Sequence, residues 1–278
     1  MKIGIIGVGV VGGATKAVME RAHEVRGYDP YRKEFEDTDN LRWIAREADI
    51  VFVCVSTPGK EDGGVGCQHI DASLAALRHE MAEVGRLPSE LVVAIRSTAM
   101  GPELDRVLNA YGFRYVCNPE FLRQARATED MEHPARVVVG TDDRDAGRTV
   151  LSAYVQAYGN ENAPQFVFTS LKAAQVTKYA ANAMLAGQIA LANEIEEICR
   201  RHGIRYRGIM HALRMDPRIG KNIEVPGPDG KRGYGGRCFP KDLSALIMCA
   251  EDTGYGAPLL KAVRDSNTQA RRRKDDAE

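Results

Sequence analysis

The stretch Lys2-Ile3-Gly4-Ile5-Ile6-Gly7-Val8-Gly9-Val10-Val11-Gly12 decides the fold of this chain. Its apolar part, Lys2 to Gly7, predicts a buried strand, and residues Gly12 to Ala22 are compatible with a helix. A second short strand is predicted from His23 to Tyr28, directly before Asp29. Glycines between a strand and a helix, with an acid after the next strand, are typical of a unit that binds a dinucleotide.

Each glycine of this motif has its own expected role. Gly7 permits a tight turn, Gly9 lets the backbone approach a pyrophosphate, and Gly12 lets the helix pack closely on the sheet. Asp29 would bind a ribose 2′-hydroxyl and repel a 2′-phosphate, which favours NAD over NADP. Two arginines nearby in the sequence, Arg26 and Arg32, weaken that preference. The cofactor-binding residues predicted here are Gly7, Gly9, Val10, Val11, Gly12 and Asp29.

The rest of the first half continues the same alternation. Strand-like runs separated by stretches of helical length imply a doubly wound parallel sheet of the Rossmann type, that is, the α/β class. These runs are Asp49 to Val55, Leu91 to Arg96, Arg114 to Cys117 and Arg136 to Gly140.

The second half reads as helical. Ser170 to His202 contains no proline and predicts one long helix. Shorter helical patterns follow at Tyr206 to Leu213, Lys241 to Asp252 and Leu259 to Gln269. We therefore expect an NAD-binding Rossmann domain over residues 1–168, and a smaller all-helical domain over residues 169–278 that carries the long central helix.

Composition narrows the possible functions. The chain has 278 residues, with 38 basic and 38 acidic side chains, so no overall charge draws it to nucleic acid or to a membrane surface. The six cysteines form no close pairs, which predicts neither a metal site nor a disulfide framework. No apolar run is long enough to cross a membrane. These features predict a cytoplasmic protein with reduced thiols.

Several polar clusters follow predicted strands or lie on helices. Ser56-Thr57-Pro58 and Ser97-Thr98 come after two strands, where loops line the ligand crevice of such a sheet. Glu120, after a third strand, could orient water or act as a base, but a solvated acid at a helix start is an alternative. Lys178 and Asn182 share one face of the long helix and could stabilise an alkoxide, although a solvated lysine is commoner.

The stretch Gly233-Tyr234-Gly235-Gly236-Arg237-Cys238-Phe239-Pro240-Lys241-Asp242 contains the candidate nucleophile. Glycines before Cys238 free backbone amides for a substrate, and nearby cations favour the thiolate form that a nucleophile needs. A single cysteine is often an inert small apolar residue. Here the polar, glycine-rich loop argues against a core position.

Taken together, these segments resemble the UDP-glucose/GDP-mannose dehydrogenase family over nearly the whole chain. The resemblance rests on the glycine motif, Ser56-Thr57-Pro58, Ser97-Thr98, Asn118-Pro119-Glu120-Phe121-Leu122, Lys178 with Asn182, Asn193-Glu194, Asp216-Pro217-Arg218-Ile219-Gly220, and Gly233 to Asp242. It implies oxidation of the C6 alcohol of a nucleotide sugar to a carboxylate with two NAD. Cys238 would attack the intermediate aldehyde to give a thiohemiacetal, which a second oxidation converts to a thioester.

The resemblance also implies roles for individual residues. The catalytic set is Cys238, Lys178, Asn182, Glu120, Asp242 and Thr98: Lys178 and Asn182 stabilise oxyanions, Asp242 joins Lys178 in proton transfer, and Glu120 with Thr98 positions water. Ser56, Thr57, Pro58, Ser97, Thr98 and, in a supporting role, Lys241 complete the cofactor site. Substrate contacts fall to Phe121, Leu122, Arg123, Lys178, Asn182, Arg218, Tyr234 and Gly235. In the family this arginine reaches the substrate of a neighbouring subunit, so Arg218 implies a homodimer built on the long helix.

The chain departs from the family pattern at places that concern the substrate. Family members usually continue into a third domain that closes over the nucleotide, and this sequence ends at Glu278. Gln124-Ala125 stands where the family has Glu-Gly, and Ala99-Met100-Gly101 stands where prolines are common. Two alternatives therefore remain open. One keeps the chemistry on a smaller substrate, namely a nucleoside or nucleoside monophosphate 5′-alcohol or a free sugar, and the other is a non-catalytic NAD-binding remnant.

Overall fold

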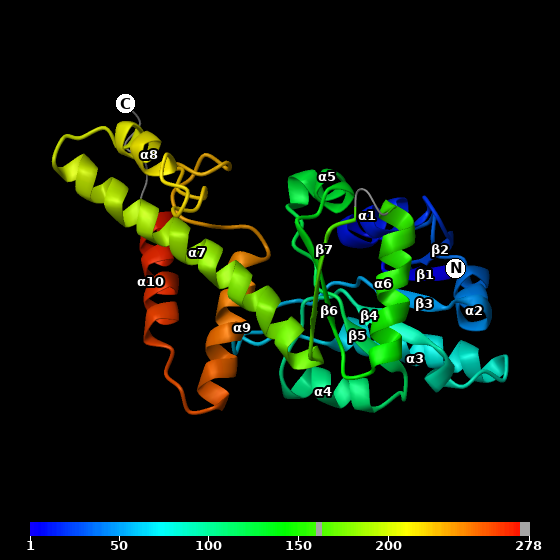
Figure 1. Cartoon of the computed structure of the whole chain (residues 1–278). Helices are drawn as coiled ribbons and strands as arrows, with labels where there is room; N and C mark the ends of the chain where they lie inside the picture. Colours follow the sequence, from blue (N-terminus) through cyan, green and yellow to red (C-terminus); the bar gives the residue numbers. More distant parts are fainter. Residues whose placement is uncertain (160–162, 273–278) are drawn as a thin grey trace. The chain divides into compact units, whose positions relative to one another are not determined.

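The computed structural model describes residues 1–159 and 163–272. These residues form two compact units (Figure 1). The first unit comprises Met1–Pro58 and Val65–Lys178, and the second comprises Gly59–Gly64 and the chain from Tyr179 onward. The predicted division after residue 168 stays a prediction, and residues 273–278 of the predicted second domain lie outside the described residues.

The first unit is built on one seven-stranded sheet with the strand order β2-β1-β3-β4-β5-β6-β7. Neighbouring strands are parallel except β5 and β6, which pair in antiparallel fashion at Cys117 and Gly140. The bounds are β1 (Lys2–Ile6), β2 (Glu24–Tyr28), β3 (Ile50–Val53), β4 (Val92–Ile95), β5 (Arg114–Cys117), β6 (Arg136–Gly140) and β7 (Gln165–Thr169). The predicted Rossmann-type class, with a long helix after the sheet, is confirmed.

The sequence did not predict β7. This strand lies at the edge of the sheet, and its Val167 and Phe168 side chains are exposed. Its run Phe166-Val167-Phe168 is of a type favoured in strands, so the sequence contained a signal for it. The other six strands occur where the sequence predicted them, with ends that differ by at most two residues.

Helices cover both faces of the sheet. The first-unit helices are α1 (Val10–Met19), α2 (Thr38–Glu47), α3 (Gln68–Glu83), α4 (Pro102–Asn109), α5 (Ala127–Glu132) and α6 (Arg144–Tyr158), with short 3-10 helices at Pro88–Glu90 and Gln124–Arg126. Residues of α1, α5 and α6 share one apolar core with Ile5, Phe52 and Val116 of the sheet. On β1, a Cβ added to Gly4 would lie 2.6 Å from Ile44, so α2 packs directly on this strand.

The glycine loop between β1 and α1 is shaped by close backbone contacts. Gly7 has a φ of +86°, and a Cβ there would lie 2.9 Å from the backbone of Cys54. A Cβ on Gly12 would lie 1.9 Å from the carbonyl oxygen of Gly7. At Gly9, by contrast, an added Cβ would meet nothing within 4 Å. The packing of the loop therefore requires glycine at positions 7 and 12. At position 9 the surrounding protein would accept a side chain, and glycine leaves that space open.

The second unit is helical. Its elements are α7 (Leu171–Arg201), which begins in the first unit, α8 (Tyr206–Arg214), α9 (Phe239–Asp252) and α10 (Pro258–Arg272). The side of α7 around Ala186 packs on Tyr234 and Leu243, and its later part packs on α8 and Ile223. The segment Gly59–Gly64 joins this unit at α9, because a Cβ on Gly59 would lie 3.4 Å from the Lys241 side chain.

In the part of the chain that the structure describes, no helix combines the length and the apolar character needed to span a membrane.

The glycine loop gives a direct test of the fold. We expect Gly12→Ala to lower the free energy of unfolding by about 1–3 kcal/mol, because its methyl group collides with a backbone carbonyl that cannot turn away. Gly13→Ala is the matched control in the same helix, since a Cβ there meets nothing within 4 Å. Gly13→Ala should raise the free energy of unfolding by roughly 0.5–1 kcal/mol. Urea unfolding measures both changes, and equal effects would contradict this account of the loop.

Candidate functional site

Asp29, at the end of β2, holds the glycine loop in place. Its side chain is 9% exposed, and its Oδ2 accepts a hydrogen bond of 2.9 Å from the Val8 amide. Its Oδ1 accepts one of 3.0 Å from the Tyr31 amide, and Arg32 donates to the Val8 carbonyl. Each carboxylate oxygen has two acceptor positions, so Asp29 can still receive a ribose hydroxyl. Arg26 is engaged elsewhere, with its guanidinium 4.7 Å from the Trp43 ring.

The start of α1 fits a pyrophosphate. Gly9 is the N-cap residue, no side chain caps the helix, and the first turn contains no acid that would repel an anion. Gly9 and Val10 are both exposed, so a ligand can reach the first turn of the helix. The open space above Gly9 provides the room that the backbone approach of a phosphate requires.

Two loops after neighbouring strands are tied together beside this turn. The Thr57 hydroxyl donates to the Thr98 carbonyl at 2.8 Å, and the Ser97 hydroxyl donates to the Val55 carbonyl at 2.7 Å. Thus the predicted cofactor residues Ser56-Thr57-Pro58 and Ser97-Thr98 lie together. They follow β3 and β4, and β3 adjoins β1, which leads into the glycine loop. The strands β2 and β3 lie on opposite sides of β1, so the order of the strands reverses at β1. Dinucleotides bind at such a reversal in a doubly wound sheet.

A buried arginine lies beneath these loops. Arg96 follows β4, is 4% exposed, and donates to Asn118 Oδ1 at 2.7 Å and to the Tyr154 hydroxyl at 2.6 Å. Tyr154 in turn donates to Asn118 at 2.6 Å, and burial raises its pKa to about 12, so the phenol stays protonated near neutral pH. Asn118 precedes Pro119 and Glu120, so the network fixes the loop that carries Glu120. From the sequence, Arg96 was predicted only as the last residue of a strand-like run.

Glu120 and Lys178 form a buried ion pair. Lys178 Nζ lies 2.9 Å from Glu120 Oε1, with side chains 6% and 11% exposed. Glu120 Oε2 also accepts the Leu122 amide at 2.6 Å, and the Phe121 ring lies 5.5 Å from the ammonium. The start of α7 packs closely against the end of β6, because a Cβ added to Gly140 would lie 2.2 Å from Ala174 of α7. The alternative interpretations from the sequence, in which Glu120 and Lys178 are ordinary solvent-exposed side chains, are therefore wrong.

In the second unit, Cys238 is exposed and forms the N-cap of α9. The positive end of a helix dipole stabilises a thiolate. Other cysteines differ, because burial raises the pKa of Cys54 to about 11 and that of Cys117 to about 12. Those thiols stay protonated at neutral pH, whereas Cys238 has both exposure and a favourable helix end.

One turn into α9 lies the buried carboxylate of Asp242, which is 1% exposed. Asn182 donates to its Oδ2 and Lys241 donates to its Oδ1, both at 2.6 Å. The Asp242 amide donates to the Cys238 carbonyl at 2.8 Å. Of the predicted catalytic residues, the structure thus joins Asn182 with Asp242 and Cys238 in one unit, and Lys178 with Glu120 in the other.

The residues predicted to contact substrate have varied surroundings. Arg123 pairs with Asp130 at 2.5 Å, Leu122 packs on the core of the first unit, and Arg218 is exposed and pairs with Asp216. Tyr234 is 4% exposed and packs edge-on against Phe239, with ring centroids 6.1 Å apart. A Cβ on Gly235 would lie 2.0 Å from the Arg271 guanidinium.

Among the described residues, no group of three or more His, Cys, Asp and Glu side chains could hold a metal ion.

Two segments match a known family. Residues 31–158 match the NAD binding domain of the UDP-glucose/GDP-mannose dehydrogenase family, and residues 172–269 match its central domain. The glycine loop and Asp29 precede the first match, so their assignment depends on the geometry above.

Relatives and solved structures agree with this match. A UDP-glucose 6-dehydrogenase of Rhizobium meliloti is 35% identical over 85% of this chain and 54% of its own length, and one of Pseudomonas aeruginosa is 31% identical over 80% and 49%. A UDP-glucose dehydrogenase structure from Pyrobaculum islandicum superposes with a TM-score of 0.82 at 25% identity, covering 96% of this chain and 68% of that chain. The chain spans about half the length of these curated relatives. It belongs to the UDP-glucose/GDP-mannose dehydrogenase family, of which it carries the NAD-binding and central domains.

Proposed function

We propose that this protein oxidises the primary alcohol of a nucleotide sugar, such as C6 of UDP-glucose, to a carboxylate with NAD. The observation that carries the proposal is the exposed Cys238 at the start of α9, one turn before the Asp242 carboxylate that Asn182 and Lys241 hold. A thiol in this position suits covalent capture of an aldehyde. Relatives named UDP-glucose 6-dehydrogenase support the same substrate class.

The residues divide the reaction between them. When bound, NAD accepts one hydride in each of the two oxidations. In the first oxidation the alcohol C–H bond breaks as its hydride leaves, and the Asp242 carboxylate takes up the alcohol proton with the help of Lys178, which leaves the aldehyde. The Cys238 thiolate then forms a C–S bond to the aldehyde carbon, and Lys178 with Asn182 stabilises the resulting alkoxide. Both groups suit this role because their side chains leave the same face of α7, one turn apart.

The second half of the reaction releases the acid. Loss of hydride from the thiohemiacetal carbon gives a thioester on Cys238. Glu120 and Thr98 orient a water molecule whose oxygen attacks the thioester carbon, and Glu120 takes up its proton. The C–S bond then breaks, and the thiolate and the carboxylate product are released. The two bonds that hold Glu120, to Lys178 and to the Leu122 amide, keep one carboxylate orientation for this step.

The first test of the proposed function concerns the choice between NAD and NADP. Asp29→Asn should lower the ratio of kcat/KM for NAD to that for NADP by about tenfold or more, because about 1.4 kcal/mol of repulsion toward the 2′-phosphate is lost. Arg32→Ala should raise the ratio, since it removes the cation beside the loop. Arg26→Ala is the control, because Arg26 contacts Trp43, and it should leave the ratio unchanged. Use of NADP as efficiently as NAD by the unaltered protein would contradict the assignment of Asp29.

The second prediction concerns stoichiometry. Purified protein with NAD and a panel of UDP- and GDP-sugars should form about two NADH per molecule of acid, because oxidation of a primary alcohol to a carboxylate removes two hydrides. Cys238→Ala should lose acid formation, whereas Cys249→Ala, which alters a half-buried thiol of the same helix, should retain it. An alanine variant that still makes acid would exclude the thiol mechanism.

The panel also separates the alternatives. Turnover only of nucleosides, nucleoside monophosphates or free sugars would replace the nucleotide sugar as substrate. Binding of NAD without turnover of any alcohol would identify a non-catalytic protein. The cytoplasmic location expected from the sequence stays a prediction.

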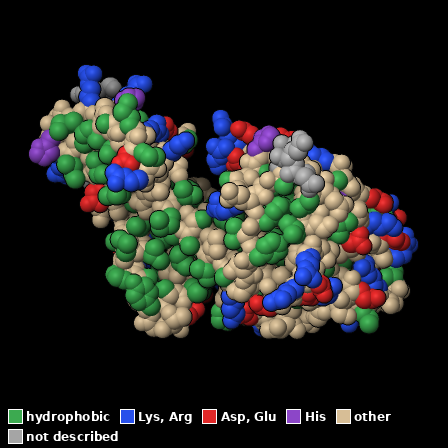
Figure 2. Space-filling view, viewed as in Figure 1, with side chains coloured by type: hydrophobic (Ala, Val, Ile, Leu, Met, Phe, Trp, Pro, Cys, Tyr) green, Lys and Arg blue, Asp and Glu red, His purple; other side chains and the backbone are tan. Residues whose placement is uncertain are grey.

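We also propose that the protein forms a homodimer through α7. The side chains of Met184, Leu191 and Ile198 are 69%, 60% and 53% exposed, although they are large and apolar. Their spacing of seven residues places them along one side of the helix. Figure 2 shows hydrophobic side chains gathered on the face of the second unit in view. Such a stripe is typical of a helix that pairs with a second copy.

We therefore expect Leu191→Glu to shift the protein from dimer to monomer in size-exclusion chromatography with light scattering, because it places a charge in the apolar seam. Leu259→Glu makes the same change at an exposed leucine of α10 that is 74% exposed, and it should remain dimeric. A monomeric unaltered protein at micromolar concentration would contradict the dimer.

A further inference from the structure

The loop that leads to Cys238 needs external restraint. It contains Gly230, Gly233 and Gly236, all with positive φ, and it forms no regular element between α8 and α9 in the described chain. Glycine-rich backbone loses much conformational entropy when it is ordered. A fixed position for Cys238 therefore depends on contacts that the loop makes with the helices around it.

Three consecutive residues of the loop are held by α7 and α10. The Gly233 amide donates to Asn193 Oδ1 at 2.8 Å, and the Tyr234 amide donates to Asn267 Oδ1 at 2.7 Å. The Tyr234 carbonyl accepts from Asn267 at 3.1 Å and from Arg271 Nε at 3.0 Å. The third residue, Arg232, makes the charged contact of this group. We call these contacts of residues 232–234 the loop clamp.

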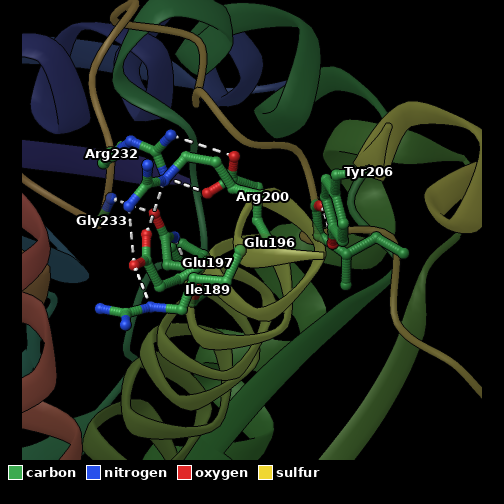
Figure 3. A network of polar contacts seen from close by, with 10 residues as sticks. Ile189, Glu196, Glu197, Arg200, Tyr206, Arg232 and Gly233 are labelled. Carbon is green, nitrogen blue, oxygen red and sulfur yellow. Dashed lines mark hydrogen bonds and ion pairs between the residues drawn. The ribbon is translucent and has the colours of Figure 1, made fainter. Parts of the chain in front are cut away.

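Arg232 and Glu196 form a two-pronged ion pair within the second unit. Arg232 Nη2 lies 3.0 Å from Glu196 Oε1, and Nη1 donates to Glu196 Oε2. The two side chains are only 15% and 13% exposed. Figure 3 shows the guanidinium of Arg232 facing the carboxylates of α7, with Arg200 and Glu197 beside it. Glu197 in turn pairs with Arg200 at 2.9 Å and with Arg201 at 2.7 Å.

We propose that the Arg232–Glu196 ion pair positions the Cys238 loop for reaction, so that both are positioning residues of the proposed dehydrogenase. The inference rests on the proposed role of Cys238. Two parallel hydrogen bonds between a guanidinium and a carboxylate fix orientation as well as distance. Because both groups are largely buried, loss of Arg232 leaves the Glu196 carboxylate buried without this partner, and loss of either residue removes the two-pronged contact from the loop. Displacement of a reacting group by about 1 Å can lower a rate on the order of a hundredfold.

The experiment compares Arg232→Met and Glu196→Gln with Arg232→Lys, which keeps the charge but not the two-pronged geometry. Arg214→Met is the matched control, because it breaks an ion pair of 2.8 Å with Glu224 in the same unit whose side chains are 33% and 53% exposed. The readouts are the rate of Cys238 alkylation by iodoacetamide from pH 6 to 10, kcat, the KM for NAD, and Tm. Peptide mass spectrometry assigns the alkylated cysteine, and Cys238→Ala is the blank.

We expect Arg232→Met and Glu196→Gln to lower kcat about 10- to 100-fold with the KM for NAD within about twofold, since cofactor residues are untouched. The alkylation profile should move to higher pH, because a displaced thiol loses the stabilisation of the α9 N-terminus. Arg232→Lys should recover part of both effects. If the first two variants fail to fold, Arg232→Lys and Glu196→Asp carry the test, with smaller shifts in the same direction.

The inference would be overturned if Arg232→Met and Glu196→Gln only lowered the Tm, with an alkylation profile and a kcat equal to those of the control Arg214→Met. Alkylation also separates this inference from the proposed function. If the unaltered protein oxidises no alcohol, the proposed function fails, but a shifted profile in Arg232→Met still supports the clamp. An unshifted profile refutes the clamp whether or not the protein turns over.

Discussion

The buried ion pair between Lys178 and Glu120 is the interaction on which the arrangement of the first unit depends. It joins the start of α7 to the loop after β5, with both side chains at most 11% exposed. Moving a charged group out of water costs several kcal/mol unless an opposite charge and hydrogen bonds replace the lost hydration. Lys178 can therefore be buried only where Glu120 faces it, and Glu120 is further fixed by the Leu122 amide. The close approach of α7 at Gly140 makes this meeting possible.

The same constraint recurs at each buried charged group near the proposed chemistry. Arg96 donates to Asn118 and Tyr154, Asp242 accepts from Asn182 and Lys241, and Glu196 pairs with Arg232. Each of these groups lies at the end of a strand, at the start of a helix or beside a loop, where backbone geometry changes. Burying charge at such places costs stability, and it holds polar groups in one orientation. Preorganised polar groups of this kind are what stabilise developing charge in an active site.

Sequence and structure agree most closely where a residue is constrained by its immediate neighbours. The glycine motif predicted the turn after β1 because Gly7 has a positive φ, and because a Cβ at Gly12 would strike the carbonyl oxygen of Gly7 in the same turn. Six strands were predicted from apolar runs. The edge strand β7 was not predicted, although Phe166, Val167 and Phe168 are residues favoured in strands. The start of α9 at Phe239, ahead of the predicted Lys241, reflects Pro240, which is favourable in the first turn of a helix.

The sequence by itself determined the class of fold, the dinucleotide turn, the long helix and the family resemblance, since all of these depend on residue type at fixed spacing. Only the tertiary structure decided which polar residues meet. It paired Lys178 with Glu120 across 58 positions of the chain, Asn182 with Asp242 across 60, and Arg232 with Glu196 across 36. No local pattern encodes such partners, because the free energy of burying a charge depends on what the folded chain brings within hydrogen-bonding distance of it.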